Sequence, residues 1–481
     1  MLRRTKIVAT LGPASNDPKV LEHMIKAGVD LVRMNFSHGS AQDHMKRAET
    51  VRTVAKSCGR TVGILADLQG PKIRIGKFEN GKIILSKGDT FILDASFDGP
   101  GNQERVGLDY KELPDDVSAG TVLLLNDGML EFHVSKVQGR QVICKVVRGG
   151  PLSNNKGINR KGGGLTAPAL TDKDKEDIKT AALIKADYLA VSFPRSGEDM
   201  RLARELMLAA GGRSMLMAKI ERAEAIPALA DIIEASDAIM VARGDLSVEV
   251  GDAAVPGLQK RMIKMARAKN RLVITATQMM ESMINNPIPT RAEVSDVANA
   301  VLDGTDAVML SAETAVGEYP VETIEAMARI CLKAEREVEE SVFDRRIGAQ
   351  KFTRVDQSIA MAALFAASHF KVKAIVALTQ SGSTTLWMSR LNAGVPIFAL
   401  TPVEETLSKV TLFSGVHPIA FLSKSRDQTQ ELRNAEQTLF ELGLVQDGDL
   451  VVMTLGEAVG KSGHTNTMKI VRIGDLNLAK Q

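Results

Sequence analysis

Short apolar runs alternate with amphipathic segments along most of the chain, and this alternation is typical of parallel α/β architecture. The rhythm stops near residue 71 and resumes after residue 167. The predicted strands are 5–11, 30–37, 61–68, 187–193, 214–221, 237–245, 271–278 and 306–313. Eight strand–helix units over roughly 250 residues favour a (β/α)₈ TIM barrel. An open, doubly wound sheet is the alternative.

The segment that interrupts the barrel pattern, residues 71–167, has a different residue pattern. β-forming residues alternate there with Gly, Asp and Asn, which predicts a small all-β insertion. A further α/β unit begins near residue 354, with strands expected at 372–379, 395–401, 417–422, 448–455 and 468–474. The sequence thus predicts a barrel at 1–70 and 168–345, an inserted β domain at 71–167 and a C-terminal α/β domain at 346–481.

The charge balance excludes several classes of protein. Lys and Arg number 61 and Asp and Glu 58 among 481 residues, so the net charge is only +3. This near balance, with 4% aromatic residues, argues against nucleic-acid binding. Three widely spaced cysteines form no disulfide framework, and the amino terminus lacks the long apolar core of a signal peptide. No apolar stretch approaches the ~18 residues of a membrane span. We therefore expect a cytoplasmic protein with neither nucleic-acid nor membrane partners.

Polar side chains stand at the carboxyl ends of the predicted barrel strands, where the catalytic groups of (β/α)₈ barrels gather. Ordinary solvation of strand ends is the alternative explanation for any one of them. Solvation explains the whole set of strand-end residues less well, because these residues place charges of both signs at one end of the barrel. The residues are Arg33, Asn35, Ser37, Asp67, Lys219, Glu221, Arg243, Gly244, Asp245, Thr275, Thr277, Ser311 and Glu313.

Glu221 and Asp245 are the candidate ligands of a Mg²⁺ ion, which prefers hard oxygens and usually takes one or two carboxylates. Lys219 lies two residues before Glu221, so both side chains project to one face of the strand. A lysine beside a metal can stabilise negative charge that develops on oxygen, although a structural salt bridge with Glu221 is the alternative. Arg33 and Arg74 can clamp a phosphate or carboxylate. The pattern points to an anionic, phosphate-bearing substrate that is handled with Mg²⁺.

Glycine-containing segments offer further phosphate sites of unequal quality. Gly244 would let backbone N–H groups approach an anion at a helix start. The segment TQSGST at 379–384 follows a predicted strand and leads into a helix, so it is a candidate phosphate cradle, although an ordinary capped turn is about equally compatible. Residues 456–462 are no Walker A loop, because three rather than four residues separate Gly456 from Gly460 and a strand follows.

Seven segments closely resemble the pyruvate kinase family, and the resemblance spans the whole chain. The most specific are TATQMMESM at 275–283 and the block 289–320. The others are LVRMNFSHG (31–39), ADLQGPKIR (66–74), MAKIERAEA (217–225), VARGDL (241–246) and SGHTNTM (462–468). The resemblance implies a (β/α)₈ barrel with an inserted small β-barrel lid domain and a C-terminal α/β regulatory domain.

The resemblance also implies a reaction: phosphoryl transfer from phosphoenolpyruvate to ADP, which gives pyruvate and ATP in the last step of glycolysis. Lys219 would stabilise the transferring phosphoryl group and the enolate, and Arg33 would contact the substrate phosphate. Thr277 would belong to the route that protonates the methylene carbon, with Ser311 and Glu313 in support. The implied substrate site comprises Arg33, Lys219, Gly244, Asp245 and Thr277, the metal ligands are Glu221 and Asp245, and the nucleotide site comprises Asn35, His38 and Arg74.

The same resemblance carries expectations about cofactor, lid and assembly. Mg²⁺ is the expected cofactor, with Mn²⁺ as a substitute. The lid would close over the barrel mouth and exclude water, which prevents wasteful hydrolysis. The family is usually a homotetramer, so coupling between sites would run through rotation of the subunits.

One departure from the family pattern concerns the monovalent cation. Potassium-dependent members resemble DTKGPEIR at this site, with an acidic residue where this chain has Lys72. In the family, Asn35, Ser37 and Asp67 would help to bind that cation. An ammonium group near the same place can supply the positive charge, so we hypothesise activity without K⁺. A surface lysine without a role is the alternative.

A second departure concerns the effector. In the family, the loop at 379–384 holds an effector phosphate, and members that use fructose 1,6-bisphosphate carry an additional Arg for the second phosphate. Val459 stands near the place of that Arg, with Lys461 nearby. We therefore expect activation by a monophosphate such as AMP, ribose 5-phosphate or glucose 6-phosphate. The loop residues are Thr379, Ser381, Gly382, Ser383 and Thr384.

Two other functions compete with the kinase. A Mg²⁺-dependent lyase or aldolase would explain Lys219, Glu221 and Asp245, but neither a nucleotide lid nor the C-terminal domain. An inactive sensor of sugar phosphates would explain the 379–384 loop, but the loss of a metal carboxylate or of the barrel lysine would then be expected. The sequence keeps all of these groups, so the kinase explains more of it.

Overall fold

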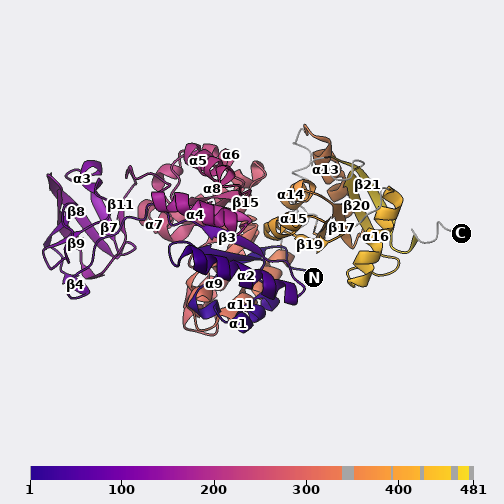
Figure 1. Cartoon of the computed structure of the whole chain (residues 1–481), viewed down its shortest axis with the longest axis horizontal. Coiled ribbons are helices and arrows are strands. Elements are labelled where there is room, and N and C mark those ends of the chain that lie inside the picture. Colours follow the sequence, from indigo (N-terminus) through magenta and orange to yellow (C-terminus); the bar gives the residue numbers. More distant parts are fainter. Residues whose placement is uncertain (1, 338–351, 392–393, 423–426, 457–463, 476–481) are drawn as a thin grey trace.

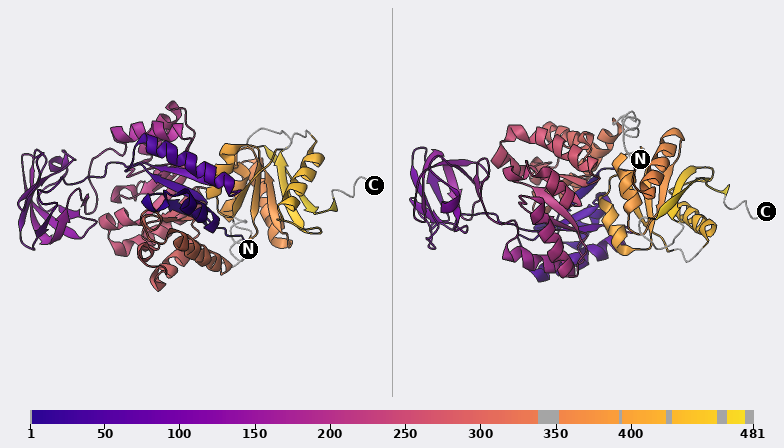
Figure 2. Two further views of the ribbon diagram at one scale, coloured as in Figure 1. Left: turned by 60° about the horizontal axis from the view of Figure 1, so that its bottom comes forward. Right: turned by 90° about the horizontal axis from the view of Figure 1, so that it is seen from above.

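The computed structural model describes residues 2–337, 352–391, 394–422, 427–456 and 464–475. Three parts lie in a row: the β insertion at one end, the barrel in the middle and the C-terminal α/β part at the other end (Figure 1). Two turned views keep this order and show that only thin connections join the insertion to the barrel (Figure 2). The barrel is therefore approached from both ends by other parts of the chain.

Eight parallel strands close into a barrel, as the alternation of apolar runs predicts. Their order around the barrel is β1-β16-β15-β14-β13-β12-β3-β2. Nearly every residue of these strands is buried, because each strand contacts helices on one face and the barrel interior on the other. The strands are β1 (Lys6–Thr10), β2 (Leu31–Asn35), β3 (Gly63–Asp67), β12 (Tyr188–Val191), β13 (Met215–Ile220), β14 (Ala238–Ala242), β15 (Leu272–Ala276) and β16 (Ala307–Leu310).

Helices cover the outside of the barrel. A capping box of a Ser or Thr with an acidic residue three positions later starts α2, α4 and α9, so local sequence fixes where these helices begin. The helices are α1 (Pro18–Ala27), α2 (Ala41–Ser57), α4 (Asp172–Leu183), α5 (Gly197–Ala209), α6 (Leu229–Ala235), α8 (Val255–Ala268), α9 (Arg291–Asp303), α10 (Ala312–Ala315) and α11 (Pro320–Arg336).

The chain turns into a helix earlier than expected after β14. The sequence pattern predicts strand up to residue 245, but β14 ends at Ala242 and α7 (Arg243–Val250) follows directly. The Gly244 N–H donates to the Thr277 hydroxyl at 2.8 Å, and the Arg243 guanidinium donates to the Thr277 carbonyl at 2.7 Å. These bonds to the loop after β15 hold the first turn of α7, and they are tertiary contacts that the local sequence does not show.

The insertion packs around one hydrophobic core that includes Phe91 and Phe132. Its six-stranded sheet has the order β11-β7-β8-β9-β5-β6, and β10 pairs with β4 separately. The backbone at Arg74 and Ile75 forms bridges to Gly157, beside β11, and to Leu108, beside β6. This stretch links the two edges of the six-stranded sheet, in agreement with the small β barrel expected for the insertion. The elements are β4 (Lys82–Leu85), β5 (Thr90–Asp94), β6 (Arg105–Gly107), α3 (Leu113–Asp116), β7 (Val122–Leu125), β8 (Leu130–Gln138), β9 (Gln141–Arg148), β10 (Gly150–Ser153) and β11 (Ile158–Arg160).

The C-terminal part is a five-stranded sheet with the order β19-β18-β17-β20-β21, parallel except for β21. The expected domain boundary between residues 345 and 346 lies outside the described residues. The elements are α13 (Val355–His369), β17 (Ala374–Leu378), α14 (Ser383–Leu391), β18 (Ile397–Thr401), α15 (Glu404–Lys409), β19 (Val416–Ala420), α16 (Gln428–Glu441), β20 (Leu450–Gly456) and β21 (Thr465–Arg472).

The C-terminal part covers the amino end of the barrel. One hydrophobic cluster joins barrel residues such as Leu31 to Leu364 and Phe413. Polar contacts reinforce this cluster at the starts of three barrel strands. Lys6 Nζ donates to the Val416 carbonyl at 2.6 Å, the Tyr188 hydroxyl donates to the Lys409 carbonyl at 2.6 Å, and Arg390 Nη1 donates to Asp306 Oδ2 at 2.9 Å. The carboxyl end of the barrel therefore remains as the end that is open to a substrate.

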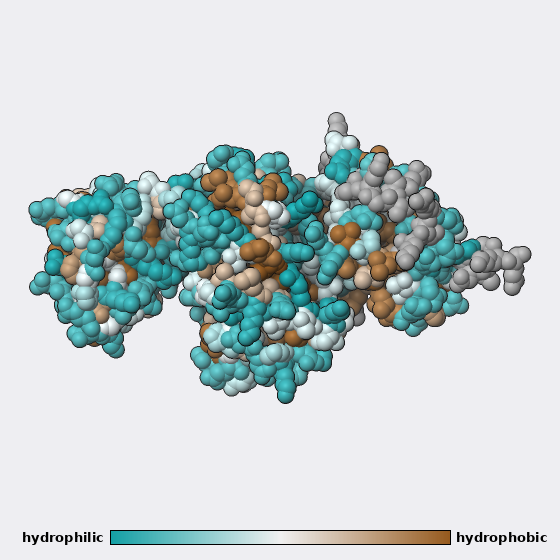
Figure 3. Space-filling view, viewed as in Figure 1, coloured by the Kyte–Doolittle hydropathy of each residue, from teal (hydrophilic) through white to brown (hydrophobic). Residues whose placement is uncertain are grey.

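The face seen in Figure 3 is mostly hydrophilic, with separate apolar patches over the barrel and the C-terminal part. None of the described helices combines the length and the apolar character that a bilayer crossing requires.

Candidate active site

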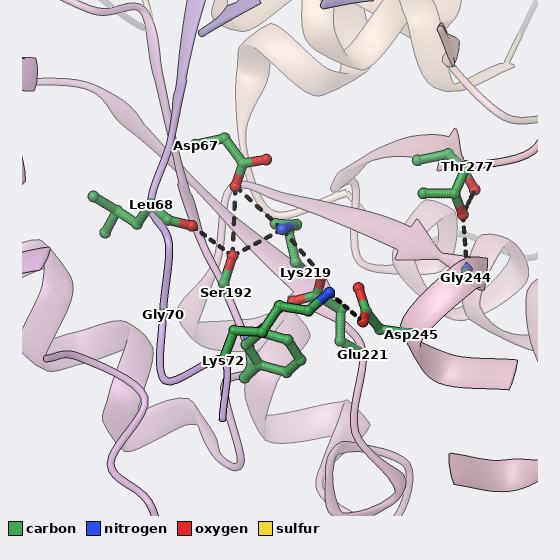
Figure 4. Close-up of polar contacts among 12 residues, drawn as sticks. Asp67, Leu68, Gly70, Lys72, Ser192, Lys219, Glu221, Gly244, Asp245 and Thr277 are labelled. Carbon is green, nitrogen blue, oxygen red and sulfur yellow. Dashed lines mark hydrogen bonds and ion pairs between the residues drawn. The ribbon is translucent and has the colours of Figure 1, made fainter. Parts of the chain in front are cut away.

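Lys219 is a buried cation at the carboxyl end of the barrel. It lies on β13, and its ammonium points toward side chains that follow the neighbouring strands (Figure 4). The ammonium lies 3.0 Å from Glu221 Oε1 and 3.3 Å from Asp67 Oδ1, and it donates to Ser192 Oγ at 2.8 Å. Burial by itself would lower the pKa of Lys219, but the charges of Asp67 and Glu221 outweigh burial and raise it. Lys219 is therefore a fixed positive charge.

Asp67, at the end of β3, is completely buried and forms ion pairs with two cationic side chains. Its Oδ2 accepts a hydrogen bond from Arg33 Nε at 2.5 Å, while its Oδ1 faces Lys219. Burial opposes the charged carboxylate, but Lys219 and Arg33 outweigh burial and hold the pKa of Asp67 below its ordinary value. The charged Asp67 thus positions both cations at the mouth.

Glu221 and Asp245 form a pair of carboxylates that lie side by side at the mouth (Figure 4). Glu221 Oε2 accepts from the Phe193 N–H at 3.0 Å. Burial raises the pKa of Glu221, Lys219 opposes this effect, and the charge of Asp245 adds to it. A divalent cation relieves repulsion of this kind, and two carboxylates with water and substrate oxygens match the preference of Mg²⁺. The pair fits Mg²⁺.

The protein supplies two acidic ligands rather than a closed metal cage. Over the described ranges of the chain, no three His, Cys, Asp or Glu side chains gather as a metal-binding group. A site of this kind leaves most coordination positions to water and substrate, which is usual for Mg²⁺ that works on phosphates.

Lys72 enters the mouth from the first residues of the insertion. Its Nζ lies 3.0 Å from Asp245 Oδ1, so it pairs with Asp245 rather than with Asp67. Asn35 and Ser37, the other residues of the predicted monovalent-cation region, are bonded to each other through the Ser37 N–H at 3.1 Å. The structure therefore brings Lys72 to the carboxylate pair of Glu221 and Asp245, which the sequence did not indicate.

Thr277 is held in an unusual backbone conformation directly after β15. Its φ of +68° lies in the left-handed region, which a β-branched residue rarely adopts. Its Oγ1 accepts from the Gly244 N–H at 2.8 Å and donates to the Ala276 carbonyl at 2.6 Å, and Arg243 binds its carbonyl. Backbone strain held by surrounding bonds is typical of functional positions, and it orients the Thr277 hydroxyl at the mouth.

A cavity of about 870 Å³ opens beside Arg33. Asn35 and His38 line it, as predicted for a nucleotide site, and Lys46 and Arg47 add two further cations. Asp43 is the only carboxylate among its lining residues. Such a cavity suits a polyphosphate.

Arg74 is the predicted nucleotide residue that does not line this cavity. Its Nη1 donates to the Asn155 carbonyl at 3.0 Å within the insertion. Ser311 does line the cavity, and the buried Glu313 carboxylate accepts from the Ser311 N–H at 2.6 Å and from the Met280 N–H at 3.2 Å. Glu313 therefore braces the loops after β15 and β16.

Sequence reasoning missed three side chains of this site. Ser192 ends the predicted strand 187–193, so the same strand-end rule could have identified it. It donates to the Leu68 carbonyl at 2.7 Å while it accepts from Lys219. Lys46 and Arg47 lie on α2, where charged residues are expected on any exposed helix face and give no signal.

The predicted effector loop lies in the C-terminal part, at the carboxyl end of β17. Thr379 Oγ1 accepts from the Gly382 N–H at 3.0 Å, and Gly382 has a left-handed φ of +77°. Ser383 Oγ donates to Asp356 at 3.3 Å, and the Thr384 hydroxyl bonds to a hydroxyl of β21 at 2.7 Å. The loop is thus a pre-formed turn. Val459 and Lys461 lie outside the described residues.

Glu249 lies at the connection between insertion and barrel. It is buried on α7, where its carboxylate accepts from the Ala223 N–H at 2.8 Å and from the Asn159 amide at 3.4 Å, and its carbonyl accepts from the Gly162 N–H at 3.0 Å. Burial raises the pKa of Glu249 to about 7, with the charge of Glu224 adding to this rise. The connection thus contains a carboxyl group that titrates near neutral pH.

A closed barrel that gathers its charged groups at the carboxyl ends of its strands is an enzyme of the (β/α)₈ class. The family model of the pyruvate kinase barrel domain matches residues 2–324, and that of the pyruvate kinase alpha/beta domain matches residues 357–471. These matches cover most of the chain. The chain therefore belongs to the pyruvate kinase family, and its activity is that of a pyruvate kinase.

Named relatives match this chain over nearly their full lengths. The chain is 55% identical over 477 residues to Pyruvate kinase II of Salmonella typhimurium, which covers 98% of this chain and 99% of the relative. It is 56% identical over 460 residues to a pyruvate kinase of Haemophilus influenzae, with 95% and 96% covered. It is 43% identical over 479 residues to a pyruvate kinase of Mycobacterium tuberculosis, with 99% of each covered.

Ser192→Ala tests the support of Lys219. Loss of one hydrogen bond to a charged group costs about 1.5–3 kcal/mol, so kcat should fall roughly 10- to 100-fold. Steady-state kinetics measures this loss. Ser214→Ala is the matched control, because Ser214 is also a buried hydroxyl, lies at the other end of the barrel and donates to the Ala186 carbonyl. Equal kcat values for the two variants would contradict the role given to Ser192.

Glu249→Gln tests the titration at the insertion. The raised pKa of Glu249 means that the folded state favours the protonated carboxyl. The wild type therefore loses stability as the pH rises from the pKa that this carboxyl has in the unfolded chain to its folded-state pKa of about 7. The variant cannot lose this contribution. Its stability relative to the wild type should grow by up to about 3 kcal/mol between pH 5 and pH 8.5.

Urea unfolding at both pH values measures the difference. Glu104→Gln, at an exposed position of the insertion, is the control, and a difference for Glu249→Gln that is flat with pH would refute the assignment.

Proposed function

We propose that the chain transfers the phosphoryl group of phosphoenolpyruvate to ADP and yields pyruvate and ATP, in the last step of glycolysis. The observation that carries this proposal is the buried Lys219 ammonium, which Asp67 and Ser192 hold beside the paired carboxylates. Phosphoryl transfer depends on positioning and on charge stabilisation. A fixed cation in a water-poor site stabilises both the transferring group and the enolate oxygen that remains.

Arg33 binds the phosphate of the substrate. Its Nε is fixed on Asp67, and it lines the cavity assigned to ADP, so it stands between the donor and the acceptor. Asn35 and His38 contact the nucleotide from the wall of the same cavity. Arg74 joins them when the insertion closes over the mouth as a lid, and this closure keeps water away from the phosphoryl group.

Glu221 and Asp245 would hold Mg²⁺, for which Mn²⁺ would substitute. When bound, the ion would supply positive charge for the anionic substrate. Gly244 and Asp245, in the first turn of α7, approach the substrate from the same side. Thr277 keeps a hydroxyl proton at the mouth on the route to the methylene carbon, and its fixed backbone orients that hydroxyl.

The enzyme works without K⁺. Two observations support this part of the proposal. The Asp67 carboxylate already has two cationic partners, so it needs no further cation. Lys72 supplies a fixed positive charge beside Asp245, at a mouth where Asn35 and Ser37 would otherwise help to hold a metal ion.

A phosphate-bearing effector controls the enzyme through the 379–384 loop. The pre-formed turn at Gly382 and the hydroxyl-rich sequence support a phosphate site. The ligand is a monophosphate such as AMP, ribose 5-phosphate or glucose 6-phosphate. The residues assigned to this phosphate are Thr379, Ser381, Gly382, Ser383 and Thr384.

The proposal includes the domain organisation and the assembly expected from the sequence. Residues 1–70 and 168–345 form the catalytic barrel, 71–167 the lid and 346–481 the allosteric domain, within a cytoplasmic homotetramer. Large exposed apolar side chains on and just before α9, among them Ile288 and Leu302, support an association surface on the barrel.

The reaction is tested by pyruvate release from phosphoenolpyruvate, ADP and Mg²⁺ in a coupled assay. The wild type should turn over, and Lys219→Met should lower kcat by about 10³-fold or more, because this factor corresponds to roughly 4 kcal/mol of lost charge stabilisation. Lys6→Met is the matched control, since Lys6 is also a buried lysine of the barrel but lies at the end that the C-terminal part covers. Absence of wild-type turnover, or full activity of Lys219→Met, would refute the proposal.

The monovalent cation is tested by Lys72→Glu. The wild type should turn over in potassium-free buffer. The variant adds a further carboxylate beside Asp245, so its turnover without K⁺ should fall about 10- to 100-fold and recover on addition of KCl. Lys77→Glu, at an exposed position of the insertion, should behave like the wild type. A wild type that requires K⁺ would overturn the role given to Lys72.

A further inference from the structure

The insertion is joined to the barrel by two connections, and the second of them contains three successive glycines (Figure 2). Gly162, Gly163 and Gly164 have φ angles of +81°, +80° and +97°. A positive φ costs a glycine little, whereas most other residues adopt it only under strain. The backbone of this glycine hinge, residues 162–164, therefore rotates more easily than the segments on either side of it.

Two glutamates of the barrel hold the glycine hinge. The Gly162 N–H donates to the Glu249 carbonyl at 3.0 Å, and the Gly164 N–H donates to the Glu224 carboxylate. The same carboxylate lies against Gly163, where a Cβ would stand 2.5 Å from Glu224 Oε2. The hinge is thus fastened to α7 by Glu249 and to the loop after β13 by Glu224.

The two glutamates affect each other's charge. Glu249 is 6% exposed, and its carboxylate accepts from the Ala223 N–H, next to Glu224 in the chain. Glu224 Oε2 is buried and has no hydrogen-bond partner among the described residues. Burial raises the pKa of Glu249 to about 7 and the charge of Glu224 adds to this rise, against the opposing effects of Ala223, Asn159 and Arg222. The hinge is therefore held by a pair of buried carboxylates that are short of positive charge.

The cations around this pair have other partners. The Arg222 guanidinium donates to the Ala167 carbonyl at 3.3 Å and lies over the Phe193 ring at 5.5 Å. Arg160 donates to the Gly164 carbonyl at 2.9 Å, and Lys72 pairs with Asp245. The charged groups on the elements around Glu249 are Arg160 on β11, Arg222 and Glu224 after β13, Asp252 after α7, and Lys72 and Asp245 across a small cavity.

We propose that Glu224 and Glu249 form a latch that holds the insertion in the arrangement of Figure 1, and that loss of the Glu249 proton to the solvent releases it. This inference rests on the lid role proposed for the insertion. With Glu249 protonated, one negative charge lies beside the hinge. With Glu249 ionised, two buried carboxylates repel each other, and a movement of the hinge hydrates both. The latch is therefore engaged at acid pH and released at slightly alkaline pH.

The latch lies next to the mouth of the barrel. A cavity of about 20 Å³ separates the two connections from the barrel, and its lining includes Lys72 and Asp245 as well as Glu224 and Glu249. It has room for water but not for an organic ligand. Lys72 and Arg74 belong to the first connection, so release of the second connection allows the insertion to carry Arg74 toward the nucleotide cavity. The latch thus controls how readily the lid closes.

Hydrogen exchange at the hinge measures the latch in the full-length enzyme without substrates. Mass spectrometry follows the amides of residues 162–164, after correction for the intrinsic pH dependence of exchange. Release returns the pKa of Glu249 from about 7 to its ordinary value, so the latched arrangement loses stability as the pH rises. The protection of these amides should fall about 10-fold between pH 6 and pH 8.

Glutamine variants identify the group that is responsible. Glu249→Gln cannot lose a proton, so its hinge protection should stay constant over this range. Glu436→Gln is the matched control, because Glu436 is a buried glutamate of the C-terminal part that accepts from the Gly474 N–H, and it should show the fall of the wild type. Glu224→Gln provides a second test that does not depend on the folding of Glu249→Gln. It removes the charge that adds to the raised pKa of Glu249, so the fall should be smaller than in the wild type.

Kinetics separate the latch from the lid role on which it rests. The ratio of kcat/KM for ADP between the wild type and Glu249→Gln should grow about 10-fold from pH 6 to pH 8. A pH-dependent hinge protection that Glu249→Gln abolishes, together with a constant kinetic ratio, would keep the latch and contradict the lid role. A wild-type protection that does not change with pH, or an equal fall in Glu249→Gln, would overturn the latch.

Discussion

The buried carboxylate of Asp67 is the interaction on which the mouth of the barrel depends. It has no exposed surface, and it holds Arg33 on one oxygen and Lys219 on the other. Two cations this close would repel each other without it, and a buried, unpaired ammonium would be several kcal/mol less stable or lose its proton. Asp67 therefore allows the barrel to keep two permanent positive charges where an anionic substrate binds. Ser192 completes this arrangement, because its hydroxyl directs the Lys219 ammonium that Asp67 has neutralised.

The charge that remains after this pairing determines what the mouth can bind. Glu221 and Asp245 are less well compensated than Asp67, since Glu221 shares Lys219 with Asp67 and Asp245 has the partly exposed Lys72 as its partner. A pKa raised by burial and by the neighbouring carboxylate is the sign of this shortage of positive charge at Glu221. The site thus separates two roles between similar residues. Asp67 orients the protein's own cations, whereas the carboxylate pair is poised for a cation from solution.

The sequence predicts the barrel well, because its eight strands are continuous apolar runs and each observed strand falls within a predicted range. Residues at strand ends, such as Lys219 and Glu221, were predictable for the same reason. The remaining features depend on contacts between distant segments. The bonds from Gly244 to Thr277 start α7 early, and the reach of Lys72 to Asp245 depends on how the insertion leaves the barrel. No local pattern encodes such contacts. Ser192 was predictable by the strand-end rule, and Arg74 could not be placed because its position depends on where the insertion lies.

The insertion and the C-terminal part are attached to the two ends of the barrel in different ways. At the carboxyl end, thin connections and a few bonds around Glu249 join the insertion to the barrel, so the insertion can move without disturbing a core. At the amino end, one hydrophobic cluster continues from the barrel into the C-terminal part, and the Arg390–Asp306 pair is buried within that junction. A packed junction of this kind transmits displacement instead of absorbing it. A displacement of the C-terminal part would therefore reach the starts of β15 and β16, the two strands that lead to Thr277 and Ser311.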